Sequence, residues 1–242
     1  MKTLFLIAGL IGLVFTSSDA AQSVTITPKK TIYKRKKPMA DFKKIFEVTY
    51  PKVKAATPAI SRRMETAIDP AIVLGVDIQE EINEVQWLEE AGYEVGYNKN
   101  RILSVMLFMY GAGAYPDGSS KYVVIDVKTG RRLKAGDLFT NLRGLVAKVK
   151  EAQAAEIEAG KVEIRKDPEM ADTDADQLFA SSDFTIKNLN EFAVSDTGVT
   201  FMYDYGFPHV IKALEPNGSY LITWAELKPF IKRPGLLARF VR

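Results

Sequence analysis

The fold is decided by residues 93–110, which read YEVGYNKNRILSVMLFMY. Segments 93–97 and 102–110 are rich in β-forming residues, and the polar tripeptide Asn98-Lys99-Asn100 lies between them. Two such segments joined by a short polar turn predict an antiparallel β-hairpin. The segments on either side show how the chain continues.

Further strands and helices are predicted around this hairpin. Residues 45–50 alternate before Pro51, and the same β-rich character returns in residues 121–127, 192–195, 199–205 and 219–223. Ile60, Met64 and Ile68 recur with the period of a short helix, and helical stripes also lie in residues 78–85, 142–152 and 224–231. Strands in hairpin order with inserted helices predict the α+β class, with an antiparallel β-sheet of hairpins covered by helices in a single compact domain.

Glycine and proline mark the predicted ends of these elements. Gly92 is expected to follow the second helix, and Gly160 to follow the long helix. Tyr115-Pro116-Asp117-Gly118 is a typical turn tetrad, because proline restricts one dihedral angle and glycine permits unusual ones.

The first 43 residues are predicted to lie outside the folded domain. Residues 1–20 combine Lys2, a short apolar run and a small-residue ending at Ala20, a pattern typical of a secretory signal peptide. Residues 21–43 carry a basic cluster and two prolines, which indicate an N-terminal arm or linker. Residues 44–242 are then expected to form the folded α+β domain. The expected location is periplasmic or secreted, with no transmembrane segment after cleavage near Ala20.

Composition narrows the functional classes further. The chain has no cysteine, so thiol nucleophiles, cysteine-rich zinc sites and disulfides are excluded. Twelve basic residues lie between positions 29 and 63, whereas nine acidic residues and no basic one lie between positions 64 and 98. Such asymmetry can steer a charged partner. Nucleic acid is not expected as that partner, because no basic motif interleaved with aromatic residues is present.

Two motifs with possible chemistry are both incomplete. His209 is the sole histidine, and no nucleophile turn of the Gly-x-Ser-x-Gly type accompanies it. Residues 172–176 begin like a calcium loop, but Gln177 replaces the required glycine and Asp183 the required glutamate. We therefore assign no catalytic residue and no metal ligand, and expect no cofactor.

Aromatic and acidic residues at strand ends are the remaining candidates for binding. Segments 110–118 and 205–209 each follow a strand and contain a proline, so we expect both on the surface and close together. Tyr115, Phe207 and His209 are expected to be at least partly exposed, and the alternative is that Phe207 fills the core. The candidate binding residues are Tyr110, Tyr115, Asp117, Tyr205, Phe207 and His209.

Several short stretches together carry a family resemblance. Residues 110–116 read YGAGAYP, residues 124–126 VID, residues 129–133 TGRRL, residues 137–139 DLF, residues 198–205 GVTFMYDY and residues 224–227 WAEL. In order and spacing, from about residue 46 to residue 231, they resemble the extracellular domain of lysozyme-sensing anti-sigma-V factors. The same domain precedes the catalytic domain of some envelope peptidoglycan deacetylases. Where the family usually reads Gly-Gly-Ala-His-Pro, this chain has Ala112-Gly113-Ala114-Tyr115-Pro116, so no role of that histidine transfers.

The resemblance implies an exported, non-enzymatic binding module that recognises a lysozyme-like hydrolase or a peptidoglycan component. Two alternatives remain open at this point: a hydrolase acting on peptidoglycan, and a structural protein of the cell surface held by the basic arm.

Overall fold

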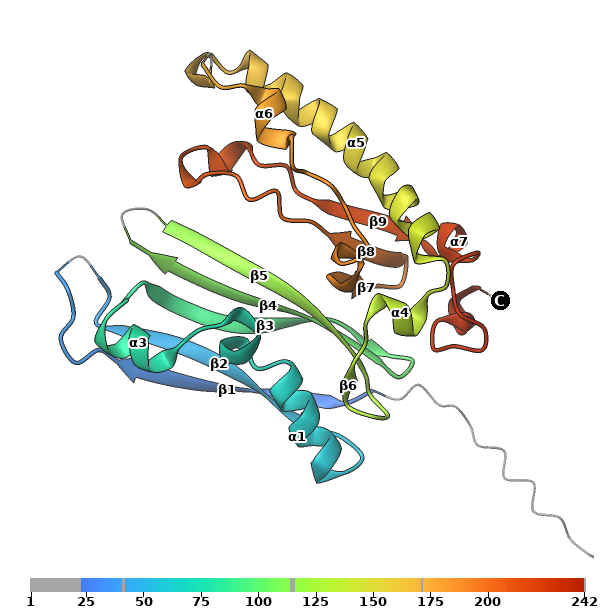
Figure 1. Cartoon of the computed structure of the whole chain (residues 1–242). Helices are drawn as coiled ribbons and strands as arrows, with labels where there is room; N and C mark the ends of the chain where they lie inside the picture. The colour runs from blue at the N-terminus through green and yellow to red at the C-terminus, as the bar shows by residue number, and fades with distance from the viewer. Residues whose placement is uncertain (1–22, 41, 114–115, 171, 242) are drawn as a thin grey trace, which may run out of the picture.

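The predicted hairpin lies within a six-stranded sheet (Figure 1). A computed structural model describes residues 23–40, 42–113, 116–170 and 172–241, without the side chains of residues 209 and 210. Strands β3 (Leu88–Lys99) and β4 (Ile102–Ala112) pair antiparallel around a two-residue turn, where Asn100 and Arg101 have φ angles of 55° and 66°. Positive φ at both central residues is typical of a type I′ turn, whose twist matches that of the strands. The hairpin prediction is confirmed, with a shorter turn than the tripeptide suggested.

The large sheet is mixed, with strand order β1-β2-β3-β4-β5-β6. Its other strands are β1 (Thr25–Lys34), β2 (Ile45–Lys54), β5 (Pro116–Asp126) and β6 (Arg131–Arg132). Strands β2 and β3 are parallel, and the other neighbours are antiparallel. A parallel pair needs a crossover connection, and helices supply it here. These helices are α1 (Pro58–Ala67), α2 (Pro70–Leu74) and α3 (Ile78–Asn83).

The crossover helices cover one face of the large sheet (Figure 1). Met64 and Ile68, from the α1 segment, are fully buried in one cluster with the β4 residues Leu103, Val105 and Leu107. The apolar residues of β4 that point to this face occur at every second position, as a strand requires. This layer is the first of two cores.

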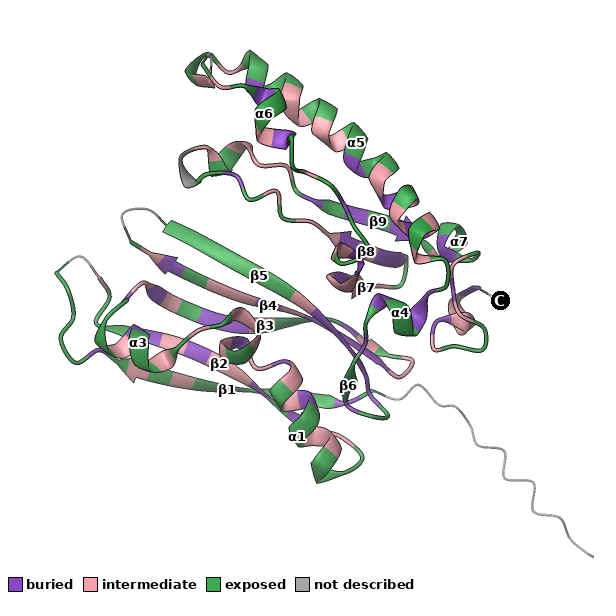
Figure 2. Ribbon diagram, viewed as in Figure 1, coloured by how far each residue is buried: buried purple, intermediate pink, exposed green. Residues whose placement is uncertain are grey.

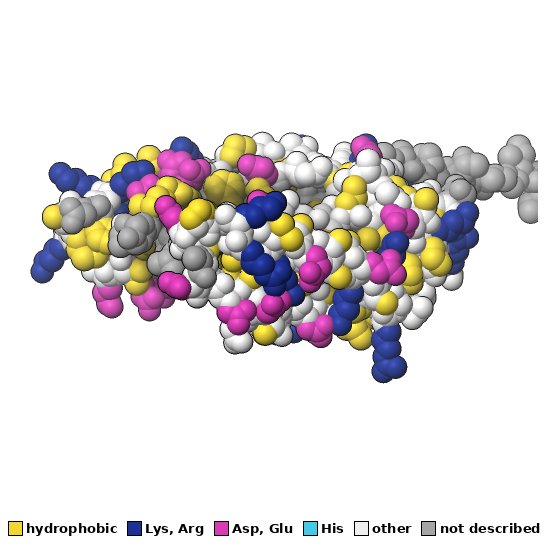
Figure 3. Space-filling model, turned by 90° about the horizontal axis from the view of Figure 1, so that it is seen from above, with side chains coloured by type: hydrophobic (Ala, Val, Ile, Leu, Met, Phe, Trp, Pro, Cys, Tyr) yellow, Lys and Arg dark blue, Asp and Glu magenta, His cyan; other side chains and the backbone are white. Residues whose placement is uncertain are grey.

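A second, three-stranded sheet forms the other layer. It contains β7 (Phe192–Val194), β8 (Gly198–Met202) and β9 (Ser219–Thr223), and the long helix α5 (Leu142–Lys166) packs across it. The short helices are α4 (Ala135–Leu138), α6 (Ala175–Phe179) and α7 (Trp224–Leu227), with 3-10 turns η1 (Pro168–Met170), η2 (Asn188–Asn190), η3 (His209–Leu214) and η4 (Ala238–Val241). Seen from above, the side of the molecule that α5 covers carries interspersed acidic and basic side chains (Figure 3). Lys148 pairs with Glu151 and Lys166 with Glu163 along this helix. This side is an ordinary solvated face.

The two sheets share the largest buried cluster. Tyr97, Ile102 and Val124 of the large sheet pack in it with Val194 and Phe201 of the small sheet, among others. The backbone N–H of Val194 also donates to Ser104 Oγ of β4, at 3.1 Å. Because one core joins both sheets, the chain forms a single compact α+β domain, as predicted.

The predicted N-terminal arm is wrong for residues 25–34. These residues form strand β1, which pairs with β2 along its whole length. Most of its side chains are exposed, so the strand lies at the edge of the sheet without an alternating apolar pattern. Residues 1–22, on which the signal-peptide prediction falls, lie outside the described residues. No helix of the described part is long and apolar enough to span a membrane.

Three of the predicted ends of strands and helices are also wrong. Pro51 does not end β2, because the parallel pairing with β3 involves Glu47 and Val48 and does not need its N–H. Pro116-Asp117-Gly118 lies inside β5, opposite residues 110–112 of β4. Gly92 lies in β3, opposite Phe108.

Gly160 is also predicted to end a helix, but it lies inside helix α5. A Cβ atom there would be 3.0 Å from Cζ of Phe179 and 3.2 Å from Cγ of Pro216. This glycine therefore permits close packing of the helix against its neighbours, and does not end the helix.

Candidate functional site

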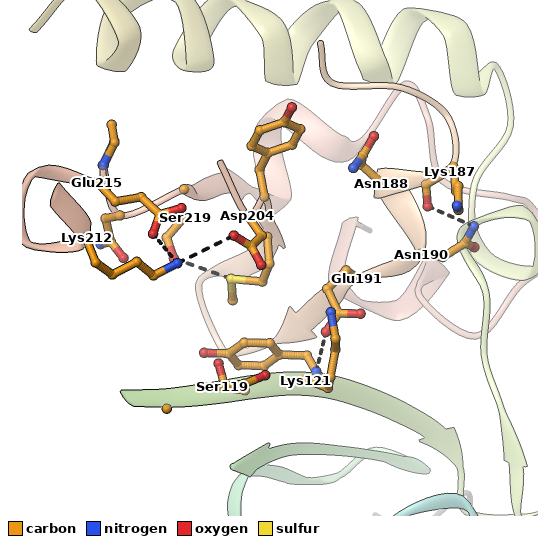
Figure 4. Close-up of a pocket in the computed structure, with 18 of the residues that line it drawn as sticks. Ser119, Lys121, Lys187, Asn188, Asn190, Glu191, Asp204, Lys212, Glu215 and Ser219 are labelled. Carbon is orange, nitrogen blue, oxygen red and sulfur yellow. Dashed lines mark hydrogen bonds and ion pairs between the residues drawn. The ribbon is translucent and has the colours of Figure 1, made fainter. Parts of the chain in front are cut away.

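A groove opens between the first half of β5 and the small sheet (Figure 4). Its volume is about 570 Å³, within the usual range for ligand sites. Five separate segments line it: residues 118–122 of β5, Arg132 of β6, residues around η2, residues 202–204 at the end of β8, and residues between 212 and 219 that lead into β9. Polar and charged side chains predominate among them.

One wall of the groove is the outer edge of strand β5, which is only partly paired with another strand. Strand β6 pairs with Ile125 and Asp126 alone, so within the described residues no strand pairs with the outer edge of the first part of β5. At Tyr122 the edge is closed by side chains, since Glu191 accepts the backbone N–H and Arg132 Nη2 donates to the carbonyl oxygen at 3.3 Å. Before Tyr122 the strand is exposed, as Figure 2 shows. This exposed portion borders the groove.

Lys212 is held on the small-sheet side of the groove by neighbouring carboxylates. Its Nζ atom pairs with Glu215 and lies 3.9 Å from Oδ1 of Asp204 (Figure 4). The hydrogen bond that Lys212 donates to Glu215 raises the pKa of Lys212 most; burial opposes the rise, and the charges of Glu215, Asp204 and Asp117 add to it. Asp117 belongs to β5 and Lys212 to η3, so the two sides of the groove are electrostatically coupled.

Two further lysines bring unneutralised charge to the groove. Lys121 and Lys187 form no ion pair with any described residue, and both line the groove (Figure 4). Three carboxylates also line it, but Asp204 and Glu215 are engaged by Lys212, and Glu191 by the backbone of Tyr122. Together with the guanidinium group of Arg132, these ammonium groups are the lining cations without an ion pair among the described residues, and they suit a ligand with carboxylate or other anionic oxygen atoms.

The structure places the first three candidate binding residues at different positions relative to the groove. Tyr110 lies on β4 and is 44% exposed, beside a smaller hollow and not in the groove. Asp117 is exposed at the end of the groove, where it acts on Lys212. Tyr115 lies outside the described residues.

Of the other three candidate residues, Tyr205 and Phe207 have structural roles. Tyr205 and Tyr220 both donate to Oε2 of Glu156 in α5, at 3.0 Å and 2.6 Å, and burial is the main cause that raises the pKa of both phenols. These bonds tie α5 to the small sheet. Phe207 is 5% exposed and packs on Phe179, with ring centroids 5.2 Å apart. The expectation that Phe207 is exposed is wrong, because α5 and α6 leave an apolar space that its ring fills.

His209 begins the turn η3, and its side chain lies outside what the structure describes. Lys212, three residues later, reaches the groove. None of residues 205–208 lines the groove; Asp204 before them and Lys212 after them do, together with Gly118 of β5. The sequence did not single out Asp204 or Lys212.

The acidic run at residues 172–176 has a structural explanation. Asp174 caps helix α6, since its Oδ1 accepts the backbone N–H groups of Asp176 and Gln177 at 2.9 Å and 3.1 Å. Asp176 pairs with Lys161 at 2.9 Å and with Arg165 at 2.8 Å. Among the described residues, no group of three acidic or histidine side chains is arranged to hold a metal ion.

Comparisons with known proteins show the fold. No family model matches the sequence, and no curated protein matches it. The structure is similar to the crystal structure of a DUF3298 family protein from Pseudomonas aeruginosa PAO1, with a TM-score of 0.50 and 15% identity over 89% of this chain and 97% of that one. It is also similar to a DUF3298 family member from Bacteroides fragilis NCTC 9343, with a TM-score of 0.56 and 11% identity over 92% of this chain and 98% of that one. At the level of fold, these neighbours agree with the resemblance described above.

Proposed function

We propose that this chain is an exported, non-enzymatic binding module of the bacterial cell envelope, which recognises a lysozyme-like hydrolase or a peptidoglycan component. The observation that carries the proposal is the groove between the two sheets, with Lys121 and Lys187 unpaired on its walls. Stem peptides of peptidoglycan carry carboxylates, and an acidic loop of a protein would present the same group. Either can form charge-assisted hydrogen bonds with lysine.

The acidic segment gives weaker support for attraction of a basic lysozyme. Of its nine carboxylates, Glu65, Glu81 and Glu89 are paired with Lys52, Arg35 and Lys43. The pairing leaves a smaller net charge than the sequence suggests. We therefore expect steering by this surface to be modest and to weaken with salt.

Calorimetric titration of the mature chain with muropeptides and with lysozymes tests the proposal. Removing both free lysines, as Lys121→Ala with Lys187→Ala, should weaken binding by about tenfold, because two charge-assisted contacts are lost. Lys54→Ala is the matched control, since this exposed lysine lies on β2 away from the groove. Wild-type protein that binds neither ligand class would contradict the proposal. Release of soluble fragments from peptidoglycan would instead favour the hydrolase alternative.

A further inference from the structure

The face of the large sheet opposite helices α1–α3 carries exposed apolar side chains. Along β4, Leu103, Val105 and Leu107 point toward the helices, so Phe108 and Tyr110 both point to the opposite face. Even-numbered residues of β4 face away from the helices, and the small sheet covers the first of them, at Ile102 and Ser104. Phe108 and Tyr110 lie beyond this cover and belong to no buried cluster of the described residues.

Each of these two aromatic residues faces a glycine on the neighbouring strand. Phe108 pairs with Gly92 of β3, and Tyr110 pairs with Gly118 of β5. A Cβ atom on Gly92 would lie 3.0 Å from Cζ of Phe108, so the tip of this ring extends across the sheet over the glycine. A Cβ atom on Gly118 would lie 3.8 Å from Cδ2 of Tyr110. Glycine at both positions leaves room for aromatic rings that lie along the sheet surface.

A hollow of about 330 Å³ adjoins Tyr110 on this face. Its apolar lining includes Ile32, Ile45 and Tyr110, which are 62%, 49% and 44% exposed. Large exposed apolar side chains grouped in one hollow mark a contact surface. The polar lining is Lys43, Glu47, Glu89 and Glu90.

The charges of the hollow are largely neutralised within the protein. Lys30 Nζ lies 2.6 Å from Oε1 of Glu47, and Lys43 Nζ lies 2.5 Å from Oε2 of Glu89. Of the lining carboxylates, Glu90 has no ion pair among the described residues. The hollow thus offers many hydrogen-bonding groups and little net charge. This combination disfavours a strongly charged partner and suits an uncharged ligand with hydroxyl groups.

We propose that this hollow and the adjoining Phe108 bind a saccharide chain. A pyranose ring has an apolar C–H face, which packs on the face of an aromatic ring, and a rim of hydroxyl groups, which donate to carboxylates. Tyr110 provides the stacking surface in the hollow, and Glu90 accepts hydroxyl hydrogens. Phe108 precedes Tyr110 by two residues on the same face of β4, about 6.8 Å away, and contacts the next sugar unit. The inference rests on the proposed function and specifies the glycan part of peptidoglycan as the ligand at this face, apart from the groove.

Titration with a soluble tetramer of β-1,4-linked N-acetylglucosamine tests the inference. Tyr110→Ala should weaken binding of this tetramer by about tenfold, the order of effect that loss of one stacking ring produces. Tyr110→Phe keeps the ring and should bind within about twofold of the wild type. Leu221→Ala is the matched control, because this residue is 49% exposed on β9 and lines neither hollow nor groove. Thermal unfolding of each variant checks that the fold is retained.

The outcomes separate the inference from the proposed function. A wild-type chain that does not bind the tetramer, or a Tyr110→Ala variant that binds it unchanged, overturns the saccharide site. In either case, binding of muropeptides or lysozyme through the groove lysines would leave the proposed function standing. Loss of lysozyme binding in Tyr110→Ala, with no binding of the tetramer by the wild type, would identify this face as a protein contact and would also overturn the inference.

Discussion

Trp87 packs against the backbone of β4 at Gly111 and leaves no room there for a side chain. A Cβ atom at Gly111 would lie 2.3 Å from the carbonyl oxygen of Trp87 and 2.7 Å from Cδ2 of its indole ring. Gly113, two residues later, is different, since its Cβ atom would lie 3.6 Å from Cδ1 of the same indole ring, an ordinary contact. The glycine repeat after Tyr110 therefore reflects packing of Trp87, and only its first member is sterically required.

Gly111→Ala should lower the free energy of unfolding by about 1–3 kcal/mol, because the strand or the indole ring must move. Gly113→Ala should be nearly neutral and serves as the matched control. Urea denaturation of both variants measures the difference. Equal stability of the two variants would show that Trp87 does not hold this strand end.

Asp126 is a second residue whose role comes from its partners. Its carboxylate accepts two bonds from Arg101, at 2.7 Å and 2.8 Å, and one from the backbone N–H of Lys128 at 3.0 Å. Burial alone would raise the pKa of Asp126, but the bonds from Arg101, Lys128 and Thr129 outweigh it and lower the pKa. A carboxyl group with a lowered folded-state pKa stabilises the protein above its unfolded-state pKa, and this contribution is lost as the pH falls through the folded-state pKa.

Asp126→Asn should therefore reduce stability at neutral pH by roughly 1–3 kcal/mol and flatten the acid side of the stability curve. Thermal melts between pH 2 and pH 7 measure both effects. Glu163→Gln removes an exposed pair with Lys166 on α5, and it should change stability by less than about 0.5 kcal/mol. An Asp126→Asn variant with the same pH dependence as the wild type would refute this role.

At the scale of elements, Arg35 fixes the connection between β1 and β2. Its guanidinium group is buried, donates to the carbonyl oxygen of Leu88 at 2.6 Å and lies 3.4 Å from the carboxylate of Glu81. It also lies over the ring of Phe46, 5.2 Å from the centroid. The basic cluster at residues 34–37 therefore contains one structural residue among exposed neighbours.

Arg35→Met should destabilise the protein by about 3–5 kcal/mol, because the carboxylate of Glu81 is left buried without its partner. Adding Glu81→Gln should recover part of the loss, since the remaining group is then uncharged. Lys36→Met, at the exposed next position, is the control and should be nearly neutral. Chemical denaturation of these three variants and the wild type checks the order, and an Arg35→Met variant as stable as Lys36→Met would contradict it.

The elements that could be predicted are those with one buried face. The hairpin β3–β4, helix α1 and the pair β7–β8 follow from apolar periodicity, which burial on one side imposes. Strand β1 could not be predicted, since an edge strand exposed on most of its length has no such period. Its pairing with β2 is a tertiary interaction, to which the local sequence gives no signal.

At the scale of the whole molecule, the bond between Ser104 and Val194 links the two sheets where their shared core lies. Ser104→Ala leaves the buried N–H of Val194 without this acceptor, and it should cost about 1–3 kcal/mol. Ser120→Ala is the control, because this serine lies on the same strand pair at the exposed end of the groove. Thermal unfolding distinguishes the two. A Ser104→Ala variant that melts with the control would show that the apolar core alone joins the sheets.

The candidate site is also a property of the whole molecule. Tyr110 and Asp117 could be selected from the sequence because they lie next to strand ends, and both are exposed at the hollow and the groove. Lys121, Lys187 and Lys212 could not, since they belong to three segments far apart in the chain that only the packing of the two sheets brings together. No spacing or motif in the sequence marks them.

The shared core and the charges of the groove lie toward opposite ends of strand β5. Ser104 of β4 pairs with Val124 of β5 beside the core, whereas Asp117 lies near the start of β5. Asp117 and Lys212 attract each other there, and dissolved salt screens exposed charges over about 8 Å at physiological ionic strength. Apolar packing between the two sheets at the inner end of the groove is therefore insensitive to this screening, whereas the attraction at its outer end weakens as ionic strength rises.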